Sequence, residues 1–230
     1  MVKVVNGVFQ SPATTIVNSD VSASAAIDVS KLAMSTNRIL GRTTAGTGAV
    51  EEISVGTGLS LTAGTLAVSG SFGTKTYAVF NAMDNQPPAT NFATLDTRNS
   101  IAILDFDDAT DESAIFLGII PEAAVLGSGL KIRIIWTAAT ATSGDCVWDA
   151  SLERMTTDID TDSFDTAASV TTTTNGTSGV PNYSEITLTT IDSVTAGDGF
   201  RLKINRDANN GSDTMTGDAE LIAVEVRSAA

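Results

Sequence analysis

Residues 130–136 read LKIRIIW, and this stretch decides the fold class because apolar side chains return at every second position. In an extended strand, successive side chains point to opposite faces of a sheet. The alternation predicts two faces: Ile132, Ile134 and Trp136 on the buried one, and Lys131, Arg133 and Ile135 on the other. A strand with one buried face is the simplest reading of this pattern.

Three further runs in the C-terminal part repeat the alternation. The expected inward side chains are Cys146, Trp148, Ala150 and Leu152, then Phe200, Leu202 and Ile204, then Ile222, Val224 and Val226. The expected outward ones are Val147, Asp149, Ser151 and Glu153, then Arg201, Lys203 and Asn205. The shorter runs TYAVF, IAILDF, AIFLGII, ASVTTTT and SEITLTTI bring the total to about eight or nine strands. We therefore predict an all-β fold whose C-terminal part is an antiparallel β-sandwich, closed as a jelly roll.

The first 72 residues follow a different pattern. Gly-Thr-Gly occurs at 46–48 and again at 56–58, between short alternating bursts. Isolated two-stranded hairpins are marginally stable in water, so neighbouring copies of the chain are expected to cover their apolar residues. These residues are Ile53, Val55, Leu59, Leu61, Leu66 and Val68. We predict two domains, an extended Gly-rich β arm over residues 1–72 and the sandwich over residues 73–230. Residues 19–33 could form a short helix capped by Ser19 or Asp20.

Charge separates the same two parts. The chain has 13 basic and 27 acidic residues, and residues 1–72 hold equal numbers of each, so residues 73–230 hold the whole net charge of −14. An acidic surface repels phosphates, which argues against a nucleic-acid partner. The neutral arm can be desolvated against a protein without leaving carboxylates unpaired. Its expected docking residues are Val4, Val5, Val8, Phe9, Ile16 and Val17.

Several enzyme classes are excluded by the inventory of reactive groups. The chain has no His, so it has no Ser-His or Cys-His pair and no imidazole metal ligand. The single Cys146 cannot form an intrachain disulfide and is interpreted as a core thiol. Trp136 and Trp148 are likewise interpreted as core. We assign no catalytic, cofactor-binding or metal-binding residue and expect the protein not to be an enzyme.

Acidic residues leave two alternatives open. Asp158, Asp160 and Asp162 alternate like the start of a calcium loop, but Ser163 and Ser169 stand where its Gly and Glu belong. A second group follows a strand and could bind a cation or form a solvated turn: Asp105, Asp107, Asp108, Asp111 and Glu112. Paired carboxylates can also hydrolyse glycosides. Few aromatic residues and no β-helix repeat weigh against that reading.

No apolar run approaches the roughly 20 residues of a membrane span, and the N-terminus lacks the apolar centre of a signal peptide. We therefore expect synthesis in a cytoplasm and no membrane partner. Residues 207–213, DANNGSD, are read as a hairpin turn.

Two long stretches carry a family resemblance. Residues 16–33, IVNSDVSASAAIDVSKLA, together with residues 37–61, NRILGRTTAGTGAVEEISVGTGLSL, resemble segments of tailed-bacteriophage structural proteins, particularly fibres and head or tail appendages. The stretches LDFDDATDESAIFLGIIPE, SGDCVWDASLERM and AGDGFRLKINRDANNGSDTMTGDAELIAVEVR are similar to a domain of many phage proteins described only as structural. The resemblance implies a virion location after synthesis in the host bacterial cytoplasm, and a homotrimer. From the hairpin pattern, we expect its subunits to meet through the six arm residues from Ile53 to Val68. It supplies no catalytic motif.

Three functions follow as hypotheses. In the first, the protein is a capsid decoration or cement protein that docks on the major capsid protein through its arm and projects the acidic sandwich. In the second, it is a tail or head fibre that docks on another virion protein, and its C-terminal domain binds a host-surface glycan or protein. In the third, it is a carbohydrate-active enzyme. Fold-level analogy does not separate decoration from fibre.

Overall fold

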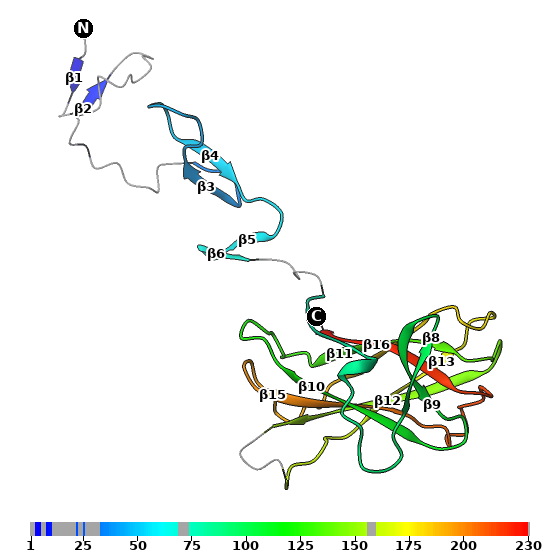
Figure 1. Ribbon diagram of the computed structural model, residues 1–230. Coiled ribbons are helices and arrows are strands. Elements are labelled where there is room, and N and C mark those ends of the chain that lie inside the picture. The colour runs from blue at the N-terminus through cyan, green and yellow to red at the C-terminus, as the bar shows by residue number, and fades with distance from the viewer. Residues whose placement is uncertain are drawn as a thin grey trace. The chain divides into compact units, whose positions relative to one another are not determined.

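Two units make up the chain in the computed structural model, Met1–Gly70 (the N-terminal unit) and Ser71–Ala230 (the sandwich) (Figure 1). The structure describes residues 3–5, 8–10, 22, 25, 33–68, 74–155 and 160–229. Most of the helix expected at 19–33 lies outside these residues. None of the described residues belongs to a helix with the length and apolar character that crossing a membrane requires.

Strands of the N-terminal unit form three two-stranded hairpins. They are β1 (Lys3–Val5) with β2 (Val8–Gln10), β3 (Arg38–Gly41) with β4 (Glu51–Ser54), and β5 (Leu59–Thr62) with β6 (Thr65–Val68). Two residues join β1 to β2 and β5 to β6, whereas a longer loop over residues 42–50 joins β3 to β4. Short strands follow from the alternating bursts and the glycines between them. No residue from 33 to 68 is buried, so the β3–β4 and β5–β6 hairpins have no core of their own.

The sandwich is built from two antiparallel sheets. The four-stranded sheet has the order β10 (Glu112–Ile119), β15 (Gly199–Arg206), β12 (Asp145–Arg154), β13 (Ala168–Thr173). The six-stranded sheet has the order β14 (Asn182–Leu188), β11 (Leu130–Ala138), β16 (Ala219–Ser228), β9 (Ile101–Phe106), β8 (Thr94–Arg98), with β7 (Thr76–Asn81) also paired to β16. A one-turn 3-10 helix, η3 (Ala82–Asp84), follows β7.

The order of the strands along the chain, compared with their order in the two sheets, identifies the topology of the sandwich. From β9 to β16 successive strands alternate between the two sheets, except that β12 and β13 are neighbours in one sheet. The resulting sheet orders, β9-β16-β11-β14 and β10-β15-β12-β13, are those of a jelly roll. The predicted all-β class, the antiparallel sandwich and the jelly roll are therefore confirmed. Strand β8 was not anticipated, because its residues TLDTR lack an alternating apolar pattern.

The core lies between the two sheets and contains aromatic side chains from both. The rings of Trp136 on β11 and Trp148 on β12 have centroids 5.8 Å apart, and Phe106 packs edge-on against Trp148 at 5.0 Å. Both tryptophans are fully buried, which confirms that they are core residues. Cys146 is also buried, and burial raises the pKa of its thiol. A neutral thiol in this position packs as a small apolar group.

Alternation predicted the inward residues of most strands correctly, with one error on β16. On β12 the expected outward residues Val147, Ser151 and Glu153 are buried as well, because neighbouring groups such as Arg201, which pairs with Glu153, cover the outer face. The pairing between β11 and β16 shifts at Ile135/Trp136, so that Trp136 lies opposite Leu221. This bulge turns Leu221 into the core, where it is fully buried, and leaves Ile222 half-buried on the outer face. The prediction that Ile222 points inward was wrong because an extra residue reverses the alternation locally.

A buried ion pair closes one end of the sandwich. Arg206, the last residue of β15, is fully buried and binds Asp213, with 2.9 Å between Nη2 and Oδ1. Its guanidinium also donates to the carbonyl oxygens of Phe106, Met215 and Gly217. Residues 207–213 therefore do not form a hairpin turn as predicted, because β15 and β16 belong to different sheets. The segment instead forms two successive turns, with backbone hydrogen bonds from Asn210 to Asp207 and from Asp213 to Asn210, and the Arg206–Asp213 ion pair anchors its end.

The beginning and end of the sandwich are bonded to each other. Strand β7 pairs antiparallel with β16. Just before β7, the backbone N–H of Lys75 donates to Ser228 Oγ, and the N–H of Ser228 donates to the carbonyl of Lys75, both at 2.9 Å. The segment that leads into the sandwich is therefore fixed beside its last strand.

Candidate assembly surface

One face of the β5–β6 hairpin is apolar and exposed. The register pairs Leu59 with Val68 and Leu61 with Leu66, and directly opposed residues share a face of the ribbon. Leu59, Leu66 and Val68 are 45%, 50% and 57% exposed. The other face carries small and polar side chains: Ser60, Thr62, Thr65 and Ala67. Four of the six residues predicted for trimerisation thus lie together on one face, which we call the leucine face.

The remaining two predicted residues lie elsewhere. Ile53 is on β4, directly opposite Ile39 on β3, and is half-buried. A Cβ at Gly41, on the same face, would lie 2.6 Å from Ile53 Cδ1, so glycine leaves the room that this side chain occupies. Val55 follows β4 and is also half-buried. The structure therefore places Ile53 and Val55 outside the leucine face.

The loop between β3 and β4 has a defined internal structure. Arg42 donates to the carbonyls of Gly46 and Ala49 and forms an ion pair with Glu51, with 3.3 Å between Nη1 and Oε1. Hydrogen bonds from Thr43 and Thr44 lower the pKa of the Glu51 carboxyl. The first Gly-Thr-Gly step therefore serves as a turn, not as a site for chemistry.

Four of the predicted docking residues lie on the first hairpin. Val4 pairs with Phe9 and Val5 with Val8 across β1 and β2. Ile16 and Val17 lie outside the described residues. This hairpin was not predicted, although Asn-Gly at 6–7 between apolar residues is a strong hairpin signal.

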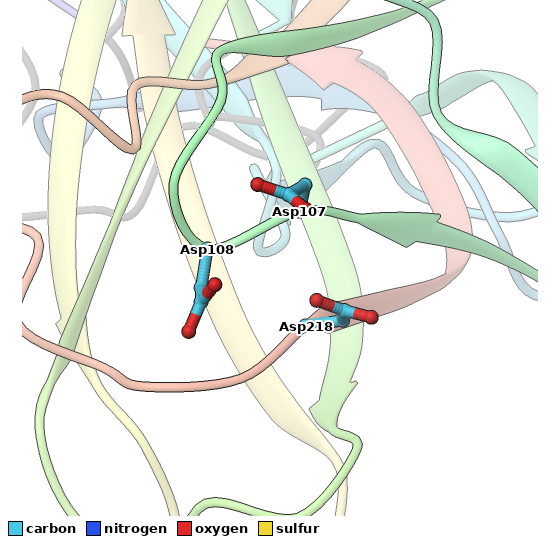
Figure 2. A group of neighbouring side chains, drawn as sticks. All are labelled: Asp107, Asp108 and Asp218. Carbon is cyan, nitrogen blue, oxygen red and sulfur yellow. The ribbon is translucent and has the colours of Figure 1, made fainter.

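Acidic residues gather at the loop after β9. Figure 2 shows Asp107 and Asp108 on this loop and Asp218 immediately before β16. One carboxylate oxygen from each lies within 4.8 Å of the others. Asp107 accepts from the N–H of Ala109 at 2.7 Å, and Asp108 accepts from the N–H of Gly217. Asp107 and Asp108 thus already accept hydrogen bonds from the loop backbone, and the grouping of the three carboxylates alone does not indicate a bound cation.

The other acidic candidates have separate places. Glu112 accepts from the N–H of Asp107 at 2.9 Å, and Asp111 accepts from the N–H of Asn209. Burial raises the pKa of Asp105 to about 6, and Glu220 and Asp218 add to this shift. For the proposed calcium loop, Asp158 lies outside the described residues, so that alternative stays a prediction.

Comparisons with known proteins give a distant likeness in fold. No protein family and no curated protein matches the chain. The CBM22-2 xylan-binding domain of Xyn10C from Paenibacillus barcinonensis is similar to 64% of this chain over 92% of its own, with 16% identity and a TM-score of 0.38. The CBM28 module specific for non-crystalline cellulose shares 10% identity over 60% of this chain and 82% of its own, with a TM-score of 0.32.

A viral protein is similar at the same level. A chain from the structure of infectious bursal disease virus, Gx strain, shares 12% identity over 81% of this chain and 40% of its own, with a TM-score of 0.29. Likenesses this distant carry no argument about function.

Proposed function

We propose that the protein is a structural component of a bacteriophage virion, a trimeric decoration or cement protein that docks on the capsid through its N-terminal arm. The exposed leucine face on a hairpin without a core carries the proposal. Apolar surface in water is unfavourable, and a two-stranded hairpin is marginal alone. Packing three leucine faces against each other would bury Leu59, Leu66 and Val68 and stabilise the hairpins at the same time.

The sandwich supports the other half of the proposal. It has its own closed core and holds the whole net charge of −14. Burying such a surface against a partner would leave carboxylates unpaired, which is costly. A body of this kind suits projection into solvent, while the neutral arm suits attachment.

Trimerisation is tested by mass measurement on the full-length protein by light scattering at micromolar concentration. We expect three times the chain mass of 23.6 kDa. The double variant Leu59→Ser/Leu66→Ser should be monomeric, because it makes the leucine face polar. The matched control Thr65→Ser/Ala67→Ser changes the opposite face and should stay trimeric. A monomeric unsubstituted protein, or a trimeric leucine-face variant, would contradict the proposed interface.

Attachment is tested with particles that lack this protein. Residues 1–72 fused to an unrelated trimeric domain should bind the heads and raise the temperature at which the particles open, because a ligand of the assembled shell stabilises that shell. Residues 73–230 alone should not bind. Binding by residues 73–230 would overturn the assignment of roles, and binding confined to the tail would place the protein among the fibres.

A further inference from the structure

A polar pocket lies on the outer face of the four-stranded sheet. The register places Asp149 of β12 opposite Asn205 of β15, and Ser151 opposite Lys203. Directly opposed side chains are about 4.5–5.5 Å apart at Cβ, and alternate residues of a strand share a face. These four side chains and Ala167 line a pocket of about 160 Å³. The site is therefore built from two cross-strand pairs on rigid sheet.

Ser151 has no hydrogen-bond partner there. Its side chain lines the pocket, the residue is only 2% exposed, and its Oγ bonds to none of the residues that the structure describes. Asp149 Oδ1 is also buried without a partner in the described part of the chain, although the carboxyl group as a whole bonds to the side chains of Ser169 and Asn205. Buried polar atoms almost always have partners in folded proteins, and an unpaired one is unfavourable. Two such atoms on one pocket wall indicate that a ligand supplies the missing bonds.

The remaining groups are arranged as donors. Asn205 Oδ1 accepts from Ser113 Oγ at 2.9 Å, and the Asn205 amide group also bonds to the Asp149 carboxyl, so one of its two amide hydrogens is left to donate. Lys203 Nζ lies 5.0 Å from the centroid of the Phe164 ring, which also stacks against Arg201. Such a contact favours one position of the ammonium group. The pocket thus combines a carboxylate acceptor, an ammonium donor, an amide donor and a hydroxyl.

This mixture of charged and polar groups favours a neutral ligand over an ion. An anion would be attracted by Lys203 but repelled by Asp149, and a cation would meet the reverse. A single carboxylate is also too few ligands for a calcium ion. A neutral molecule with adjacent hydroxyl groups can donate to Asp149 and accept from Lys203 and Asn205, and Ser151 can do either.

We propose that this pocket binds one sugar residue through its hydroxyl groups. The volume is below the roughly 300–1,000 Å³ of pockets for drug-sized ligands, which suits a single ring and not an oligosaccharide. Because the contacts are few, we expect dissociation constants on the order of millimolar. The proposal concerns the sandwich alone and does not depend on trimerisation or on capsid attachment.

The test is saturation-transfer NMR on the full-length protein with the methyl glycosides of glucose, galactose and mannose at tens of millimolar. At least one should give a saturable signal. Ser151→Ala should weaken its binding about 3- to 10-fold, as expected for one lost hydrogen bond. This variant removes an unpaired buried hydroxyl, so its melting temperature should equal or exceed that of the unsubstituted protein.

Lys203→Met should abolish the signal, whereas Lys131→Met, the matched control on the other sheet, should leave it unchanged. The proposal fails if none of the three glycosides gives a signal, which would mean that the pocket holds only water. It also fails if the signal persists in Lys203→Met. Saturable binding of acetate or Ca²⁺ at this pocket, with no glycoside bound, would show that the inferred ligand charge is wrong.

Discussion

Similar apolar residues are buried in one unit of the chain and exposed in the other. In the sandwich, Leu152 and Leu221 are fully buried between two sheets. In the N-terminal unit, Leu59 and Leu66 occupy equally regular strand positions but are 45% and 50% exposed. An alternating pattern alone therefore does not stabilise a strand. Stability requires that another part of the structure covers its apolar face. The sandwich supplies that cover from within one chain, whereas we propose that the hairpins obtain it from other copies of the chain.

The largest effect is expected where the sandwich depends on a buried charge. Asp213→Ala removes the partner of Arg206 and leaves its guanidinium buried and uncompensated, which should lower the free energy of unfolding by about 3–5 kcal/mol. Urea unfolding followed by the fluorescence of the buried tryptophans measures this change. The control Asp96→Ala, on exposed β8, should change it by less than about 0.5 kcal/mol. Equal midpoints for the two variants would contradict the role of the ion pair.

A matched pair of leucines compares the two units directly. Leu152→Ala leaves a cavity in the core and should lower the free energy of unfolding of the sandwich by about 2–5 kcal/mol. Leu66→Ala should leave that unfolding within about 0.5 kcal/mol, but should weaken the trimer in the mass measurement. If Leu66→Ala lowers the stability of the sandwich as much as Leu152→Ala does, the independence of the two units is wrong.

The smallest effect concerns the acidic surface of the sandwich. The pKa of Asp105 is raised to about 6, so the folded state holds this proton more tightly than the unfolded state. Its contribution to stability is full below the ordinary pKa and is lost as the pH rises through about 6. The melting temperature should therefore fall between about pH 5 and 7, and Asp105→Asn should flatten this part of the profile.

Asp198 provides the control for this profile. Hydrogen bonds from Thr195 lower the pKa of its carboxyl, and Arg154 adds to this shift. The stability that Asp198 contributes is therefore lost only as the pH falls through the lowered pKa. Asp198→Asn should destabilise the protein at neutral pH and leave the slope between about pH 5 and 7 unchanged. A slope that persists in Asp105→Asn would assign it to other carboxyls.

Sequence alone predicted the strands whose faces differ in polarity. Phe200, Leu202 and Ile204 are buried as the alternation of β15 required. The bulge at Ile222 could not be found this way, because it depends on how β16 pairs with β11. Arg206 lies two residues after Ile204, so the alternation of β15 places it on the buried face. This position was the only signal in the sequence for its burial. Its partner Asp213 lies in a loop, where no periodicity applies.

The leucine face and the polar pocket also differ in how far the sequence predicts them. The leucine face follows from two short bursts joined by a turn, so four of its residues were named in advance. The polar pocket joins Ser151 and Lys203, which are 52 positions apart and meet only through the pairing of β12 with β15. Such a pair requires the strand register, and local sequence does not contain it. Both residues were predicted to face outward, but nothing in the sequence indicated that they lie opposite each other.

The bonded contact between Lys75 and Ser228 has a mechanical consequence. If the arm holds the protein to a particle, tension enters the sandwich at Lys75 and acts first on β7, which pairs with β16. If the pull is directed away from β16, the hydrogen bonds of β7 are loaded one after another, beginning at Lys75, instead of all together. The sandwich should therefore yield by peeling of β7. The eight strands of the jelly roll, from β9 to β16, would remain closed behind it.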